Sequence, residues 1–159
     1  MKKKTNTALL ISFVLWLMTL SATAQTYESF IEKGLAAAQA QQYDEAIEQF
    51  RQALRLSPDD IRNALTYANI AHIQELKGEQ MKALDSYDLA LGIAPLNVPI
   101  LKSQADLFLT LGNQSKALLN YTKILDVAPN NIEALLARAY IYQQQRNYQG
   151  AKTDYERLL

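Results

Sequence analysis

Residues 43–58 read YDEAIEQFRQALRLSP, and this stretch decides the fold because its pattern returns three times further along the chain. An alanine recurs at a near-constant spacing, at Ala46, Ala83, Ala117 and Ala151. An aromatic residue four positions later keeps the same spacing, at Phe50, Tyr87, Tyr121 and Tyr155. Such a period is too short to hold a domain, so it indicates one helical unit stacked on copies of itself.

A third column of small residues lies twelve positions before the alanine, at Gly34, Ala71, Ala105 and Ala139. It predicts a further helix that comes first in each unit, so the alanine and the aromatic residue belong to the second helix. Small residues allow two helix axes to approach closely, and the aromatic side chain fills the space beside them. Pro58, Pro95 and Pro129 are expected to end the second helices. Asp59, Asp60, Asn97, Asn130 and Asn131 follow these prolines as candidate N-caps.

The turns inside the second and third units contain Gly78 and Gly112, residues suited to a positive φ. The corresponding turns of the first and last units contain Gln41-Gln42 and Arg146. We expect those two turns to be less well specified.

These columns resemble the tetratricopeptide repeat (TPR) family, over about residues 27–159. The resemblance implies an all-α fold, an α-solenoid in which antiparallel helix pairs form a right-handed superhelix. We expect one TPR domain over residues 25–159 with about 3.5–4 units, at 27–60, 61–97, 98–131 and 132–159, the last incomplete. The second unit carries three extra residues near positions 59–63, which predicts either an additional helical turn or a longer connector.

The N-terminal segment, residues 1–24, differs in composition from the repeats. Lys2, Lys3 and Lys4 precede an apolar run over residues 8–20, and Ala22-Thr23-Ala24 follows. This order is typical of a signal peptide, so we expect residues 1–24 to be removed and the protein to be exported to the periplasm or cell envelope. The alternative is an uncleaved membrane anchor over residues 8–24, the one way in which we expect the chain to contact a membrane.

The charge balance argues against nucleic acid as a partner. Three of the 16 basic side chains lie in that N-terminal segment, so the remainder carries 13 basic and 16 acidic side chains and lacks a basic excess to hold phosphates. The chain has no cysteine and one histidine, His72. It also lacks a phosphate-binding loop or nucleophile motif, so we predict no enzymatic activity, no cofactor, no metal and no small-molecule substrate.

In TPR proteins the first helices of the units line the concave groove, so the resemblance implies that a protein or peptide binds there. In this register the candidate groove residues are Asn69, His72, Glu75, Lys102, Asp106, Tyr140 and Gln143. One class of the family grips the C-terminus of a chaperone with lysine and asparagine side chains. The matching places in the first unit hold Ile31 and Leu35, and no adjacent units supply the set, so that activity is not predicted.

The sequence therefore favours a non-enzymatic, exported scaffold or adaptor that mediates protein–protein interaction. Two alternatives stay open. The chain can be the N-terminal repeat region of a larger protein with an enzymatic or signalling domain beyond residue 159. It can also be a structural protein that self-associates through its uncapped last unit, because the sequence stops at Leu158-Leu159 inside the expected second helix.

Overall fold

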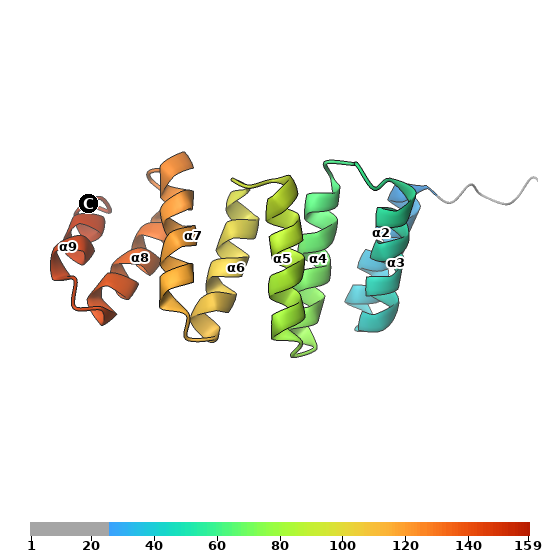
Figure 1. Cartoon of the computed structure of the whole chain (residues 1–159), viewed down its shortest axis with the longest axis horizontal. Helices are drawn as coiled ribbons and strands as arrows, with labels where there is room; N and C mark the ends of the chain where they lie inside the picture. Colours follow the sequence, from blue (N-terminus) through green and yellow to red (C-terminus); the bar gives the residue numbers. More distant parts are fainter. Residues whose placement is uncertain (1–25) are drawn as a thin grey trace, which may run out of the picture.

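The computed structural model describes residues 26–159, which form α-helices joined by short turns and no strand within that range (Figure 1). The helices are α2 (Tyr27–Gln39), α3 (Tyr43–Leu56), α4 (Asn63–Leu76), α5 (Gln80–Ile93), α6 (Val98–Thr110), α7 (Gln114–Val127), α8 (Ile132–Gln144) and α9 (Tyr148–Glu156). The predicted signal peptide, residues 1–24, lies outside the described residues. Within the described residues, no helix has both the length and the apolar character needed to cross a bilayer.

These helices form an elongated row of antiparallel pairs (Figure 1). Each first helix packs most extensively on its own second helix, in the pairs α2–α3, α4–α5, α6–α7 and α8–α9. Each second helix then contacts the first helix of the next pair. The chain is therefore an all-α solenoid of about four units, as predicted, in which each unit touches mainly its neighbours.

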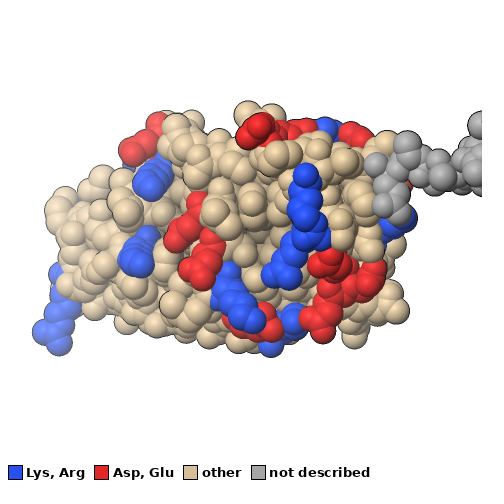
Figure 2. Space-filling model, turned by 45° about the vertical axis from the view of Figure 1, so that its right-hand side comes forward, with Lys and Arg blue, Asp and Glu red and all other residues tan. Residues whose placement is uncertain are grey.

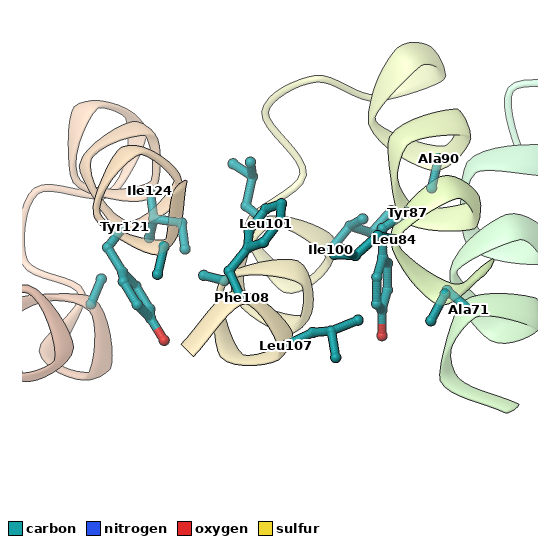
Figure 3. Close-up of a cluster of buried hydrophobic side chains, with 14 of the residues drawn as sticks. Ala71, Leu84, Tyr87, Ala90, Ile100, Leu101, Leu107, Phe108, Tyr121 and Ile124 are labelled. Carbon is teal, nitrogen blue, oxygen red and sulfur yellow. The ribbon is translucent and has the colours of Figure 1, made fainter. Parts of the chain in front are cut away.

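The repeated columns form the core. Ala46, Ala83 and Ala117 are completely buried, and Ala151 nearly so. In Figure 3 the ring of Tyr87 on α5 lies between Ala71 of α4 and Ile100 and Leu107 of α6. The close approach that the small residues permit is most evident at Gly34, where an added Cβ would lie 2.6 Å from the Phe50 ring.

Asparagine caps begin four of the helices. The side chains of Asn97, Asn113, Asn131 and Asn147 accept hydrogen bonds from backbone amides in the first turns of α6, α7, α8 and α9. The caps at Asn97 and Asn131 agree with the prediction. The predictions at Asp59, Asp60 and Asn130 are wrong, because α4 begins without a side-chain cap and Asn131 holds the cap position of α8.

The three extra residues of the second unit lengthen the connector, and α4 also begins one residue earlier in the register than α6. The connector spans residues 57–62, against 94–97 and 128–131 at the later junctions. Asn63 is buried and donates from Nδ2 to the backbone carbonyls of Ser57 at 2.7 Å and Pro58 at 3.0 Å. Asp60 accepts a hydrogen bond from the backbone amide of Arg62 at 2.8 Å. These bonds fix the course of the longer connector, and α4 begins without a side-chain cap.

Candidate protein-binding face

The predicted groove residues all lie on first helices, and none is buried. Asn69, His72 and Glu75 lie on α4, Lys102 and Asp106 on α6, and Tyr140 and Gln143 on α8. We call the solvent-exposed side of α2, α4, α6 and α8 the first-helix face. Besides these seven residues, it includes Ile31, Leu65, Glu133 and Leu136.

The structure brings Lys102 and Asp106 together at the centre of this face. Lys102 Nζ lies 2.9 Å from Asp106 Oδ2 and 3.6 Å from Glu133 Oε2 on the next first helix. The other oxygen of Asp106 accepts a hydrogen bond from the hydroxyl of Tyr121. The hydrogen bond to Asp106 raises the pKa of Lys102, so the ammonium stays charged through the physiological range. One cation is therefore shared by two carboxylates.

Glu75 makes a related contact in the preceding unit. Its Oε1 accepts a hydrogen bond from the buried hydroxyl of Tyr87 at 2.6 Å. Burial first, and then the nearby carboxylate, raises the pKa of both Tyr87 and Tyr121. Glu75 and Asp106 therefore have a structural role as acceptors for core tyrosines, beside any role in binding.

The other candidates are not joined to this centre. Within residues 26–159, Asn69, His72, Tyr140 and Gln143 form no side-chain hydrogen bond or ion pair. Tyr140 is 52% exposed, and Leu136, one turn earlier on α8, is 47% exposed. An exposed aromatic residue beside an exposed leucine is the kind of patch that contributes apolar contact area to an interface.

Sequence reasoning missed a cleft of about 380 Å³ between α2 and α4. Its lining includes Tyr27, Ile31, Leu65 and Thr66, together with the candidate Asn69. Glu28, Glu32 and Arg62 also line it. The signal that could have located it is the pair Ile31 and Leu65: the third unit has Lys102 at the position of Ile31, and the first and last units have Glu28 and Glu133 at the position of Leu65.

Sequence reasoning also missed a series of buried and partly buried polar contacts between helices. Ser86 donates to Gln74 at 2.7 Å, Gln104 donates to Asp88 at 2.6 Å, and Asn120 donates to Gln104 at 2.8 Å. In the last unit, Arg138 donates from Nε and Nη2 to the two oxygens of Asp154 at 2.7 and 2.6 Å. Ser86, Asn120 and Asp154 follow the repeat period but differ in type, which hides the column in the sequence.

The described residues offer no grouping of three or more His, Cys, Asp or Glu side chains that could hold a metal ion. On the face that Figure 2 draws, acidic and basic side chains are interspersed, with extensive uncharged areas between them. The first-helix face is itself mixed in charge and partly apolar, because Lys102, Asp106 and Glu133 lie on it with the exposed Leu136 and Tyr140.

Comparison with known proteins gives the same family for both ends of the repeat array. Tetratricopeptide repeat models match residues 27–60 and 132–159. Photosystem I assembly protein Ycf3 of Cyanophora paradoxa is 34% identical over 98 residues, which are 60% of this chain and 57% of that protein. Ycf3 of Prochlorococcus marinus (strain NATL1A) is 32% identical over 79 residues, 50% of this chain and 46% of that protein. The chain thus spans about half the length of the curated relatives that it matches.

Solved structures agree on the fold. A tetratricopeptide repeat protein from Parabacteroides merdae ATCC 43184 is 34% identical, with a TM-score of 0.79 over 84% of this chain and 52% of that one. MamA, at 18% identity, has a TM-score of 0.73 over 89% of this chain and 81% of its own. The first TPR of Spaghetti (RPAP3), bound to the HSP90 peptide SRMEEVD, is 22% identical with a TM-score of 0.66, and covers 77% of this chain and 95% of that one.

The relatives correct one prediction. The expected export to the periplasm or cell envelope is contradicted, because the curated relatives are photosystem I assembly proteins rather than exported periplasmic proteins. The composition of residues 1–24, on which that prediction rested, does not outweigh the similarity over the repeats.

One assignment follows from the helix pairs and from the recurring columns of small and aromatic residues. The two repeat-model matches and the structural neighbours lead to the same assignment. The chain belongs to the tetratricopeptide repeat family.

Proposed function

We propose that this protein is a non-enzymatic scaffold or adaptor and that it binds a protein segment along its first-helix face. The observation that carries the proposal is the exposure there of Leu65, Leu136 and Tyr140, at 56%, 47% and 52%. Apolar side chains that the fold does not bury, beside charged groups that can orient a partner, favour protein binding. The names of the relatives support this, since they are assembly proteins, and one structural neighbour holds a peptide. Residues 25–159 are proposed to act as a single TPR domain with the unit boundaries given above.

The test is a variant that changes the face and spares the fold. We would combine Lys102→Ala, Asp106→Asn and Tyr140→Ala. Asparagine is preferred at position 106 because it keeps an acceptor for the Tyr121 hydroxyl. The matched control combines Leu119→Ala, Lys123→Ala and Asp126→Asn on α7, where Leu119 is 56% exposed.

Crosslinking in intact cells that express the natural protein would first identify its partners. The amount of each partner captured would then be measured for the first-helix variant and for the α7 control. The proposal expects the first-helix variant to lose those partners and the α7 control to keep them, with unchanged circular dichroism in both. Equal capture by both variants would rule out this face as the binding surface.

Self-association is a second candidate, favoured by one observation. Tyr148, Tyr155, Leu158 and Leu159 line an open cleft of about 630 Å³ on the last pair. Tyr155 is 40% exposed, whereas Tyr87 and Tyr121 in the same column are 2% exposed because the next pair covers them. If the natural chain self-associates, the double variant Tyr148→Ser and Leu159→Ser should be monomeric when its mass is measured by light scattering. A natural chain that is already monomeric at high concentration would exclude this use of the cleft.

A further inference from the structure

The cleft between α2 and α4 extends the first-helix face to the N-terminal pair, and its chemistry differs from that of the centre of the face. Tyr27 and Thr66 form its floor, where the Tyr27 hydroxyl and Thr66 Oγ1 are 2.7 Å apart. Tyr27 is 6% exposed and Thr66 is 2% exposed. The two hydroxyls share one hydrogen bond, and Thr66 Oγ1 also lies 3.5 Å from the carbonyl oxygen of Arg62, so the floor leaves neither hydroxyl without a partner. The Arg62 guanidinium lies over the Tyr27 ring, 4.4 Å from its centroid, so the apolar surface that the cleft offers comes mainly from Ile31 and Leu65.

The rim of the cleft is acidic. Arg62 is its cation, and two carboxylates bind it: Glu28 Oε1 at 2.6 Å from Nη1 and Asp60 Oδ2 at 2.5 Å from Nη2. Hydrogen bonds from Arg62 lower the pKa of both Glu28 and Asp60, so both stay ionised at neutral pH. Glu32, which also lines the cleft, makes no ion pair within residues 26–159. The rim therefore carries two carboxylates, Glu28 and Glu32, and one cation, Arg62, which a third carboxylate, Asp60, binds from outside the lining.

The same imbalance continues along the face. Lys102 is shared by Asp106 and Glu133, and Glu75 is paired with a neutral tyrosine. Arg62 and Lys102 are thus each already held by two carboxylates. An approaching acidic segment would find both of these cations occupied, while a basic segment would find carboxylates in excess.

Resting on the proposed function, we infer that this cleft docks a protein segment in which an apolar side chain is flanked by lysine or arginine. The apolar side chain contacts Ile31 and Leu65, and the cationic side chains bind Glu28 and Glu32 at the rim. This is the reverse of the acidic peptide SRMEEVD held by the structural neighbour. Affinity comes from the buried apolar area, and selection against acidic segments comes from the carboxylates.

The experiment uses the full chain and a phage-displayed library of random short peptides. An enriched peptide is then synthesised with a fluorophore, together with a partner peptide in which each Lys or Arg is replaced by Glu. Binding is followed by fluorescence anisotropy at low and high salt.

Two protein variants carry matched controls. Leu65→Ser removes apolar contact from the cleft, and Leu119→Ser removes a leucine of the same 56% exposure from α7. Glu32→Lys reverses a rim charge, and Asp85→Lys makes the same reversal at an exposed position of α5.

The inference expects enrichment of peptides that combine apolar and basic residues, with binding that weakens as salt rises. Leu65→Ser and Glu32→Lys should each weaken binding by about five- to tenfold, and their controls by less than about twofold. Enrichment of acidic peptides, equal binding of the Glu-substituted peptide, or equal effects of variant and control would overturn it. Binding that appears only after Lys2, Lys3 and Lys4 are changed to Glu would also overturn it, because the chain's own N-terminal segment would then be the occupant.

The two experiments distinguish a wrong assignment of the α2–α4 cleft from a wrong proposed function. If crosslinked partners still depend on Lys102, Asp106 and Tyr140 while basic peptides do not bind, the adaptor function stands and the assignment of the cleft is wrong. If basic peptides bind the cleft but natural partners ignore the first-helix face, the proposed function is wrong.

Discussion

At the scale of single residues, the four turns inside the helix pairs each place one residue at positive φ. Gly78 and Gly112 have φ of 75° and 74°, while Gln41 and Arg146, which are not glycines, have φ of 59°. The absence of glycine is the reason for the prediction that these two turns are less well specified, and the structure places Gln41 and Arg146 in them at positive φ. A side chain in this left-handed region costs about 1–2 kcal/mol, which exceeds the extra chain entropy that glycine loses on folding.

We therefore expect Gln41→Gly and Arg146→Gly each to raise the free energy of unfolding by about 0.5–1 kcal/mol. Urea denaturation followed by circular dichroism would measure the change. The reverse substitution, Gly78→Gln, should lower the midpoint. A Gln41→Gly variant with an unchanged midpoint would show that this turn carries no strain.

Ala117 tests packing at a single position. It is completely buried where α6 and α7 cross, whereas Leu119 on the same helix is 56% exposed. Ala117→Arg should lower the free energy of unfolding by about 1–3 kcal/mol from overpacking, with a further loss from the buried charge. Leu119→Arg is the control and should leave the melting temperature nearly unchanged. Similar melting curves for both variants would contradict the observed packing.

At the scale of helices, the sequence predicts the pairs well because alanine, aromatic and proline columns all keep one period. It does not predict what links the pairs. One position of the first helices shows this: it holds Ile70 in α4, Gln104 in α6 and Arg138 in α8. Ile70 packs in an apolar cluster, Gln104 forms a hydrogen bond with Asp88, and Arg138 forms an ion pair with Asp154. The α2–α4 cleft was missed for a similar reason, since the course of the longer connector depends on tertiary hydrogen bonds such as those of Asn63.

The Arg138–Asp154 pair holds α9 on α8. The side chains are 14% and 1% exposed, so the ion pair is largely removed from water. Asp154→Ala leaves the guanidinium buried without its main partner, and loss of one member of a buried pair costs about 3–5 kcal/mol. We expect α9 to lose protection in amide hydrogen exchange in this variant. Lys152→Ala, at an exposed position of the same helix, is the control; equal exchange in the two variants would show that the pair does not anchor α9.

The contacts of Tyr87 with Glu75 and of Tyr121 with Asp106 predict sensitivity to alkali. Burial and the adjacent carboxylate raise the pKa of each phenol above its value in the unfolded chain. A raised pKa gives stability that is fully present below the unfolded pKa, about 10, and is lost as the pH rises beyond it. Melting temperature should therefore fall steeply above about pH 10. Tyr87→Phe should make the fall shallower, and a fall of the same slope would show that this tyrosine does not contribute.

At the scale of the whole molecule, the core is divided rather than continuous. One large cluster runs from Ala64 of α4 to Ile141 of α8. The first pair is joined to the rest through a smaller cluster in which Ile70 and Ile73 of α4 pack with Phe50 of α3. The longer connector and the α2–α4 cleft lie at this same junction, so the stack has its least continuous core between the first and second pairs.

This division of the core predicts which helix pairs unfold locally first. Interior pairs are covered on both sides, so amide hydrogen exchange should be slowest in α5–α7 and faster in α2, α3 and α9. Ile70→Ala removes apolar contact from the smaller cluster alone, at a cost of about 2–5 kcal/mol. It should speed exchange in α2 and α3 much more than in α6 and α7. Ile124→Ala, in the large cluster, is the control and should speed exchange in α6 and α7. Uniform acceleration along the chain in the Ile70 variant would mean that the four pairs unfold as one cooperative unit and that the junction is not a separate point of opening.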